Sequence, residues 1–366
     1  MPWSPEQPYN DLPALPPEIE LETAPVLKQC IQSRATLAEL DQAADFLPNK
    51  SLLINVMPLL EARASSEIEN IVTTSDRLFR STALENSPTD SATKEALSYR
   101  KALRIGFESI QERPLSTSTA EEICSVIKQK EMRIRQVPGT TLMNERTGET
   151  TYTPPVGESL IREKLANWET FLHTSSDLDP LVKMAAAHYQ FEAIHPFTDG
   201  NGRTGRVLNL LILISEGLLK APILYHSRGI IRRKSEYYQN LRAVTSHNAW
   251  EAWIIYILQV VEESARWTND KITSIRELCE ETKARLKKDH SNIYSAELLD
   301  VLFNQPYCRI PDLVQAGIAK RQAASTYLKQ LVSGGLLTEE KVGREKLFIH
   351  QSFLALLLDE SDPLAS

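Results

Sequence analysis

Apolar residues recur every three or four positions along most of this chain, a spacing that predicts helices and leaves little material for a sheet. Between residues 21 and 113 the apolar stripe includes Leu52, Val56 and Leu60. Pro58 suits the first turn of a helix, where its missing N–H is tolerated, so we expect a new helix from Pro58 to about Asn70. Further helical patterns cover residues 118–133, 158–173, 180–192, 202–219, 235–243 and 250–265, and a long polar helix follows to about 288. The predicted fold class is mainly α.

Two segments depart from the helical pattern before the C-terminal part of the chain. Residues 1–20 are rich in proline, which favours an extended path over a neighbouring surface. Residues 136–155 are rich in threonine and glycine, with a Thr-Gly turn at 147–148. They predict a short β-hairpin.

Size and composition limit the class of protein. The 366 residues allow two or three domains, which we place at 1–113, 114–285 and 290–366 with a linker at 287–292. The net charge of −7 argues against a protein whose main role is to grip nucleic acid. The four cysteines have neither disulfide-like nor zinc-like spacing, and no apolar run is long enough to span a membrane. A cytoplasmic protein without membrane association is expected.

The C-terminal unit shows the order helix, helix, helix and hairpin. Its helices are predicted at residues 295–303, 310–315 and 320–333, and its hairpin turns at Gly343 and Arg344. This order is typical of a winged helix-turn-helix unit. Residues 294–350 carry seven basic and six acidic side chains, which is not the basic surface expected of a DNA reader. We therefore favour protein interaction over DNA binding for this unit, and a homodimer remains open.

The sequence HPFTDGNGRTGR, residues 195–206, lies between two helical patterns and leads into a helix N-terminus. Such an N-terminus presents free backbone N–H groups and a partial positive charge to an anion. Gly200 and Gly202 let the backbone approach a ligand closely. Arg203 and Arg206 share a face of the first turn, where two guanidinium groups suit a polyphosphate. The loop therefore predicts an anion site.

Two other side chains of this loop add chemistry to the anion site. His195 is a neutral base that can take a proton from an attacking hydroxyl. Asp199 is the type of carboxylate that binds Mg²⁺ together with phosphate oxygens. The combination indicates phosphoryl or nucleotidyl transfer.

These twelve residues match the signature HPFx(D/E)GNGRxxR at every fixed position. The chain thus resembles the Fic family, in the arrangement of its SoFic-like bacterial members with an N-terminal inhibitory helix. The resemblance implies a Fic helical core with a β-hairpin flap and protein adenylyltransferase activity (AMPylation), with His195 as the general base and Asp199 as the Mg²⁺ ligand. It assigns ATP binding to the residues Asp199, Gly200, Asn201, Gly202, Arg203, Thr204, Gly205 and Arg206. Gly202 stands where the phosphotransferase branch has lysine, which favours AMP transfer.

The predicted hairpin is similar to the family's flap, which implies that a target segment pairs with it by strand addition. Thr151, Tyr152 and Thr153 would then contact the target, with Tyr152 clamping it from the flap tip. Further along the chain, Tyr237 and Asn240 resemble the segment that borders the adenine, so Tyr237 is included among the predicted ATP-binding residues.

The sequence SSEIEN, residues 65–70, resembles the family's inhibitory motif (S/T)xxxE(G/N), which begins here with Ser65. The resemblance implies that Glu69 forms a salt bridge with Arg206. The resemblance also implies that Arg206 reaches the γ-phosphate of ATP. A carboxylate on this guanidinium would remove that contact and repel ATP, so autoinhibition is expected.

We therefore expect a Mg²⁺-dependent enzyme that moves AMP from ATP to Tyr, Thr or Ser hydroxyls of target proteins and of itself. Two alternatives remain at this point. One is a Fic-type transferase that uses another donor or removes AMP. The other is a nucleotide-sensing regulator that binds DNA through its C-terminal unit.

Overall fold

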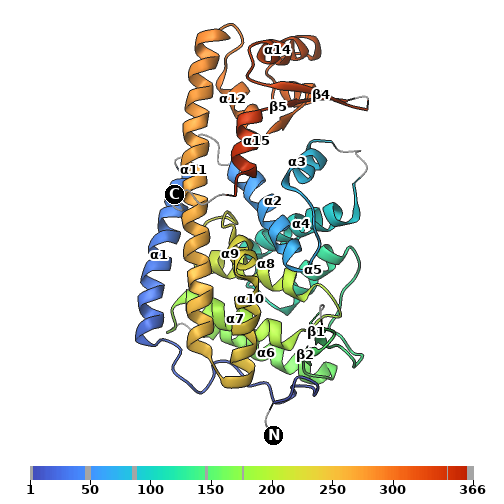
Figure 1. The fold of residues 1–366 in the computed structure, drawn as a ribbon, viewed down its shortest axis with the longest axis vertical. Helices are drawn as coiled ribbons and strands as arrows, with labels where there is room; N and C mark the ends of the chain where they lie inside the picture. The colour runs from blue at the N-terminus through green and yellow to red at the C-terminus, as the bar shows by residue number, and fades with distance from the viewer. Residues whose placement is uncertain are drawn as a thin grey trace.

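The computed structural model describes residues 3–45, 51–84, 89–144, 147–174, 177–343 and 345–360. Helices dominate these residues and the sheets are small, which confirms the predicted mainly α class. The molecule is elongated along α11 (Trp250–Asp289), with the C-terminal elements beside one end of that helix and the hairpin toward the other (Figure 1). None of the described helices, α11 included, is long and apolar enough to cross a membrane.

The N-terminal region is built from four helices. They are α1 (Ala24–Asp45), α2 (Ser51–Ile68), α3 (Ser75–Ala83) and α4 (Ser91–Glu112). α1 packs along α11, and α2 packs on α4. The side chains of Thr74 and Asp90 cap α3 and α4 by accepting hydrogen bonds from the backbone N–H groups of Arg77 and Thr93.

Pro58 lies inside α2, so the prediction that a helix begins there is wrong. The helix buries one apolar stripe that runs past the proline on both sides. Its members are Leu52, Leu53, Val56, Met57, Leu59 and Leu60. The free energy gained by burying this stripe outweighs two costs of the proline, the lost backbone hydrogen bond and the steric clash of its ring with the preceding turn. α2 ends at Ile68, and Asn70 follows with a φ of 60°, close to the predicted end.

The centre of the molecule is α7 (Pro180–Ile194), which is buried on all its faces. Around it lie α5 (Thr117–Lys128), α6 (Glu158–Thr174), α8 (Asn201–Ser215), α9 (His226–Arg232), α10 (Lys234–His247) and α11. The ring N–H groups of Trp168 on α6 and Trp253 on α11 donate to the carbonyls of Ala187 and Ala185. These bonds fix both helices against α7. The short helix α9 was not predicted.

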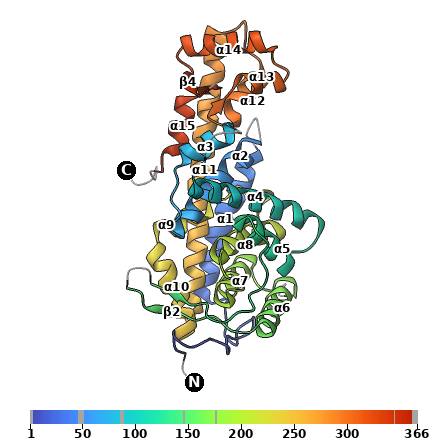
Figure 2. The same cartoon turned by 90° about the vertical axis from the view of Figure 1, so that its right-hand side faces the viewer.

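The C-terminal unit follows α11 in the predicted order, with additions. Its elements are α12 (Ala296–Asn304), β3 (Tyr307–Cys308), α13 (Ile310–Gln315), α14 (Arg321–Ser333), β4 (Thr338–Val342), β5 (Glu345–Ile349) and α15 (Gln351–Leu358). The strands form an antiparallel sheet in the order β3-β5-β4. The unit lies beside the C-terminal half of α11 (Figure 2). β3 and α15 were not predicted, and Arg344 of the predicted turn lies outside the described residues. The winged helix-turn-helix assignment stays a prediction.

Residues 250–289 form one continuous helix, where the sequence suggested two. At about 1.5 Å per residue α11 is roughly 60 Å long. Its second half stays helical because Trp267, Ile272, Ile275 and Cys279 are buried, in contact with neighbours that include α1, α12 and α15. The helix runs past residues 285 and 287, where the predicted core ends and the predicted linker begins, so the domain limits stay a prediction.

The C-terminal unit is tied to α2 and α3, the helices on either side of the predicted inhibitory glutamate. The guanidinium of Arg80 on α3 donates to both carboxylate oxygens of Glu340 on β4, at 2.7 and 2.8 Å. On α2, Arg63 forms an ion pair with Glu360, and Asn55 bonds to Asn304 of α12. These contacts fix the C-terminal unit to the N-terminal helices.

The predicted hairpin is confirmed, although its strands are short. β1 (Leu142–Met143) and β2 (Thr150–Tyr152) are antiparallel, and Gly148 turns between them with a φ of 71°. The N-terminal segment lies against this hairpin, as an extended path over a neighbouring surface predicts. The backbone N–H of Tyr9 donates to the carbonyl of Thr153 at 3.0 Å, and the hydroxyl of Thr153 donates to the carbonyl of Pro5 at 2.7 Å.

Candidate active site

The signature loop joins the end of α7 to the start of α8. His195 closes α7 with a φ of 48°, and Gly200 opens α8 with a φ of 82°, a backbone conformation that favours glycine. Between them, the side chain of Asn201 bonds to both the N–H and the carbonyl of Phe197, each at 2.8 Å. Phe197 is fully buried. The loop is therefore a rigid connection, anchored by Asn201 and Phe197.

His195 is half-buried at the end of α7. Burial of the ring and the positive charge of Arg135 lower the pKa of His195 to about 4, against the opposing effect of a backbone hydrogen bond with Glu192. The imidazole is therefore neutral at neutral pH, which is the form that accepts a proton.

Arg135 was not predicted, yet it holds the loop in place. Its side chain is buried and donates to the carbonyls of His195 at 2.8 Å, of Ile194 at 3.3 Å and of Pro155. Its backbone N–H also donates to the carbonyl of Pro196 at 2.9 Å. One arginine thus joins the signature loop to the base of the hairpin.

Arg206 is held by the segment that resembles the inhibitory motif. Only 1% of Arg206 is exposed, and its guanidinium donates to the hydroxyl and the carbonyl of Ser65, both at 2.8 Å, and to Glu69 Oε1 at 2.9 Å. Burial opposes the charge, but Glu69 and other acidic groups nearby raise the pKa of Arg206 above its ordinary value. The predicted contact between Glu69 and Arg206 is present.

Glu69 also holds the second arginine of the loop. Arg203 Nε donates to Glu69 Oε2 at 2.7 Å, and Arg203 Nη1 donates to Glu95 Oε2 at 2.7 Å. A Cβ at Gly202 would lie 2.7 Å from Glu69 Oε1, so the absence of a side chain there gives the carboxylate its place. The glutamate oxygens therefore lie at the first turn of α8, between two arginines, where we predicted phosphate oxygens.

Asp199 is the exposed carboxylate of the loop, with 54% of its side chain accessible. Its Oδ2 lies 2.5 Å from Lys128 Nζ, and its Oδ1 lies 3.8 Å from Arg203 Nη2. Partial burial would raise its pKa, but Lys128 and Arg203 hold the pKa of Asp199 below its ordinary value. The described residues contain no group of three or more acidic, histidine or cysteine side chains that could hold a metal. One hard, exposed carboxylate does suit Mg²⁺ that takes its other ligands from phosphates and water.

Two predicted ATP-binding residues face the protein interior. Thr204 is fully buried, and its backbone N–H donates to the carbonyl of Gly200 inside α8. A Cβ at Gly205 would lie 2.5 Å from Glu192 Oε1. Burial raises the pKa of Glu192 to about 7. Both residues pack α8 against its neighbours, and their assignment to ATP binding stays a prediction.

Tyr237 was also predicted to contact the nucleotide, and the structure places it in the core. Only 2% of it is exposed, its hydroxyl lies 2.9 Å from His188 Nε2, and its ring packs on Trp253. Asn240 donates to the carbonyl of Glu236 on its own helix. The ring is covered by its neighbours in this structure, and the assignment of Tyr237 to the adenine stays a prediction.

The three flap residues are held by contacts within the chain. Thr151 donates to the carbonyl of Leu142 at 3.0 Å, and Thr153 is covered by the N-terminal segment. Tyr152 is buried in β2, and its hydroxyl donates to the carbonyl of Ala193 at 2.8 Å. Tyr152 therefore anchors the hairpin to the end of α7, and its role as a clamp on the target stays a prediction.

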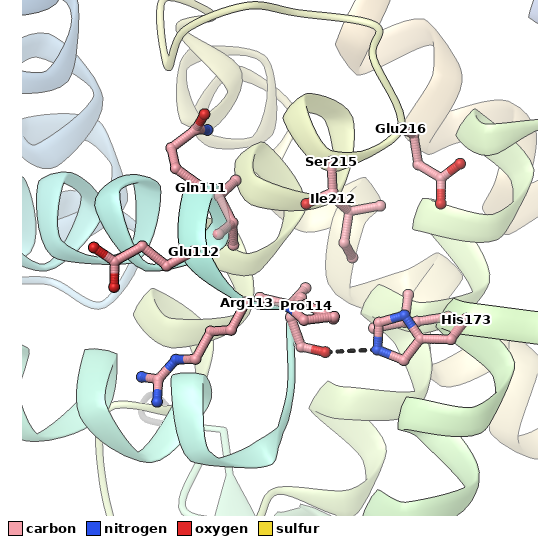
Figure 3. A pocket seen from close by; sticks show the side chains of 11 residues that line it. Gln111, Glu112, Arg113, Pro114, His173, Ile212, Ser215 and Glu216 are labelled. Atoms are coloured by element: carbon pink, nitrogen blue, oxygen red, sulfur yellow. Dashed lines mark hydrogen bonds between the residues drawn. The ribbon is translucent and has the colours of Figure 1, made fainter.

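A separate cavity of about 430 Å³ opens between the C-terminal ends of α4, α6 and α8 (Figure 3). His173 and Glu216 lie on its wall, and the ring N–H of His173 donates to the carbonyl of Leu115 at 2.8 Å. None of the predicted site residues lines it. We therefore assign it no part in the chemistry of the loop.

Models of three protein families match consecutive parts of the chain. They are the Fic/DOC family N-terminal domain over residues 27–108, the Fic/DOC family over 114–213, and the C-terminal domain of SoFic-like protein adenylyltransferase over 278–353. Together they cover the greater part of the sequence, including the inhibitory motif and the signature loop.

Individual relatives match over shorter stretches. The chain is 37% identical over 89 residues to protein adenylyltransferase fic-1 of Caenorhabditis elegans, which is 24% of this chain and 16% of that protein. It is 35% identical over 132 residues to a probable protein adenylyltransferase of Aquifex aeolicus, which is 35% of each chain. The matched stretches thus span about a third or less of these relatives.

Solved structures agree in fold. A Fic family protein from Desulfovibrio desulfuricans G20 superposes with a TM-score of 0.57 and 16% identity over 94% of this chain and 98% of that one. A fragment of Fic-1 from C. elegans superposes with a TM-score of 0.52 and 20% identity over 68% of this chain and 74% of that one. These likenesses show a common fold, and the three family models, which together cover the greater part of the sequence, show that the chain belongs to the Fic/DOC family.

Proposed function

We propose that this protein is a protein adenylyltransferase that moves AMP from ATP to hydroxyl side chains of target proteins and of itself. The observation that carries the proposal is the arrangement at the start of α8: a neutral histidine, a rigid loop and two buried arginines around one anion site. The names of the relatives point to the same activity.

The proposed reaction forms a bond between the target oxygen and the α-phosphorus and breaks the bond from that phosphorus to the bridging oxygen. Pyrophosphate leaves, and His195 accepts the proton of the hydroxyl. Backbone N–H groups at the start of α8 and the guanidinium of Arg203 would bind phosphate oxygens. Arg206 would bind the γ-phosphate once Glu69 releases it. Asp199 would hold Mg²⁺, which would neutralise phosphate charge.

We also propose that the structure represents an inhibited state. The carboxylate of Glu69 stands in for an anion: it bonds to both arginines and lies beside Gly202 at the mouth of α8. A triphosphate would have to displace it to reach Arg206. Until then, charge repulsion and the missing γ-phosphate contact would leave the α-phosphate misplaced for attack.

The hairpin region exposes apolar side chains that suit the docking of a target protein. Val137 and Met143 of the hairpin region are exposed at 72% and 59%, and we propose that a target segment docks beside them. The four cysteines are free, which supports a cytoplasmic setting. DNA binding by the C-terminal unit and a homodimer stay predictions.

The identity of the transferred group tests the proposed function. ATP labelled at the α-phosphate should leave its label on protein, whereas label at the γ-phosphate should not. The intact mass of the modified protein should rise by one adenylyl group. Retention of γ-label, or a mass gain that fits another group, would identify a different transferase.

The low pKa of His195 predicts the pH dependence of transfer. The base must be unprotonated, so kcat/KM should fall only as pH drops through about 4. Between pH 5 and 8 the acid side of the profile should therefore be flat for an enzyme released from Glu69. An acid limb near the ordinary histidine value of 6.5 would contradict this assignment.

A further inference from the structure

Lys128 is the last residue of α5 and meets the signature loop from the side. Its Nζ lies 2.5 Å from Asp199 Oδ2, and only 16% of its side chain is exposed. α5 packs on α8, and the thiol of Cys124, one turn earlier, lies 3.4 Å from the carbonyl of Asp199. The lysine is therefore held at the loop by its helix.

The shape of the loop fits the stem of this lysine. A Cβ at Gly200 would lie 3.2 Å from Lys128 Cδ and 3.3 Å from Lys128 Cγ, so the stem passes over the glycine in close contact. Gly200 thus serves two needs, a positive φ and room for the lysine. This contact places the ammonium group on Asp199 instead of in open solvent.

This inference rests on the proposed function, in which Asp199 binds the metal ion. A divalent cation that binds Asp199 must compete with the ammonium group for the same carboxylate. Bound ATP changes the balance, since its phosphates offer the ammonium group other negative oxygens. Arg203, at 3.8 Å from Asp199, is held by Glu69 and Glu95 and is less able to move.

We propose that Lys128 is the resident counter-ion of Asp199, which keeps divalent cations off the empty site and binds nucleotide phosphate when ATP enters. Metal and nucleotide would then arrive together. Lys128 thereby makes the complex of metal and ATP, and not the free metal ion, the species that the site binds.

The proposal predicts two effects of opposite sign for Lys128→Met, which keeps the stem and removes the charge. In the full-length protein without nucleotide, Mn²⁺ followed by electron paramagnetic resonance should bind about tenfold more tightly than to wild type. In a Glu69→Gly background with metal chelated, ATP followed by calorimetry should bind about tenfold more weakly. Lys128→Arg should restore both values, and Lys130→Met, at an exposed residue two positions on, should change neither.

Equal Mn²⁺ binding by wild type and Lys128→Met, or binding by neither, would overturn the proposal, as would loss of both affinities together. If Lys128→Met does not fold, Lys128→Gln is measured by the same two assays. Asp199→Asn separates this inference from the proposed function. If it leaves Mn²⁺–ATP binding unchanged, the metal assignment itself fails, whereas loss of that binding with no effect of Lys128 defeats only the inference.

Discussion

The Glu69→Gly variant is expected to transfer AMP about a hundredfold faster than the wild-type protein, because misplacement of a reacting group by about 1 Å can cost that factor. The carboxylate of Glu69 accepts hydrogen bonds from both arginines of the loop, Arg203 and Arg206. Its removal frees Arg206 for the γ-phosphate and removes a negative charge from the path of ATP. The rate is measured as α-label incorporated into protein, including the variant itself.

Glu67 provides a matched control for this prediction. It lies in the last turn of α2, two residues before Glu69, but its carboxylate pairs with Arg63 at 3.5 Å. Glu67→Gly should therefore leave transfer near the wild-type rate. An equal rise in both variants would mean that loosening the end of α2 matters and that the contact of Glu69 with the arginines does not. Absence of any rise in Glu69→Gly would remove the inhibitory role altogether.

Replacing His195 by alanine in the Glu69→Gly background should reduce transfer by about a thousandfold, within the range typical of a lost general base. ATP binding should change by less than about threefold, since charge-assisted phosphate contacts come from the arginines and the start of α8. Both quantities are measured on one preparation, binding by calorimetry and transfer by label. His247→Ala, at an exposed histidine, is the control.

Two outcomes would contradict the role of His195. Transfer that persists near the Glu69→Gly rate would mean that another group takes the proton. Loss of ATP binding in parallel with transfer would mean that the alanine disturbs the loop that Arg135 holds, and that the imidazole is a structural part of the site.

The sequence points directly to those parts of the candidate site that form continuous strings. His195, Asp199 and Arg206 lie within twelve residues, and Glu69 lies in a short motif with its own spacing. Lys128 and Arg135 were missed because they lie far from the loop in the chain and look like ordinary polar residues of a helix end and a connection. Only packing of α5 on α8 brings Lys128 to Asp199.

The places where the structure differs from the local sequence pattern have a common physical origin. An aromatic residue such as Tyr152 or Tyr237 suits a ligand surface and a core equally well, and spacing does not tell which face is covered. Tyr237 is covered by Trp253, and Tyr152 by the end of α7. In α2, similarly, burial of apolar neighbours kept a proline inside a helix, against the local preference of the backbone.

The most direct test of the whole account is a crystal structure of the Glu69→Gly variant with Mg²⁺ and a non-hydrolysable ATP analogue. The account predicts a γ-phosphate oxygen within about 3 Å of the Arg206 guanidinium, and backbone N–H groups at the start of α8 directed at the phosphates. A nucleotide bound elsewhere, with Arg206 still bonded only to Ser65, would contradict it.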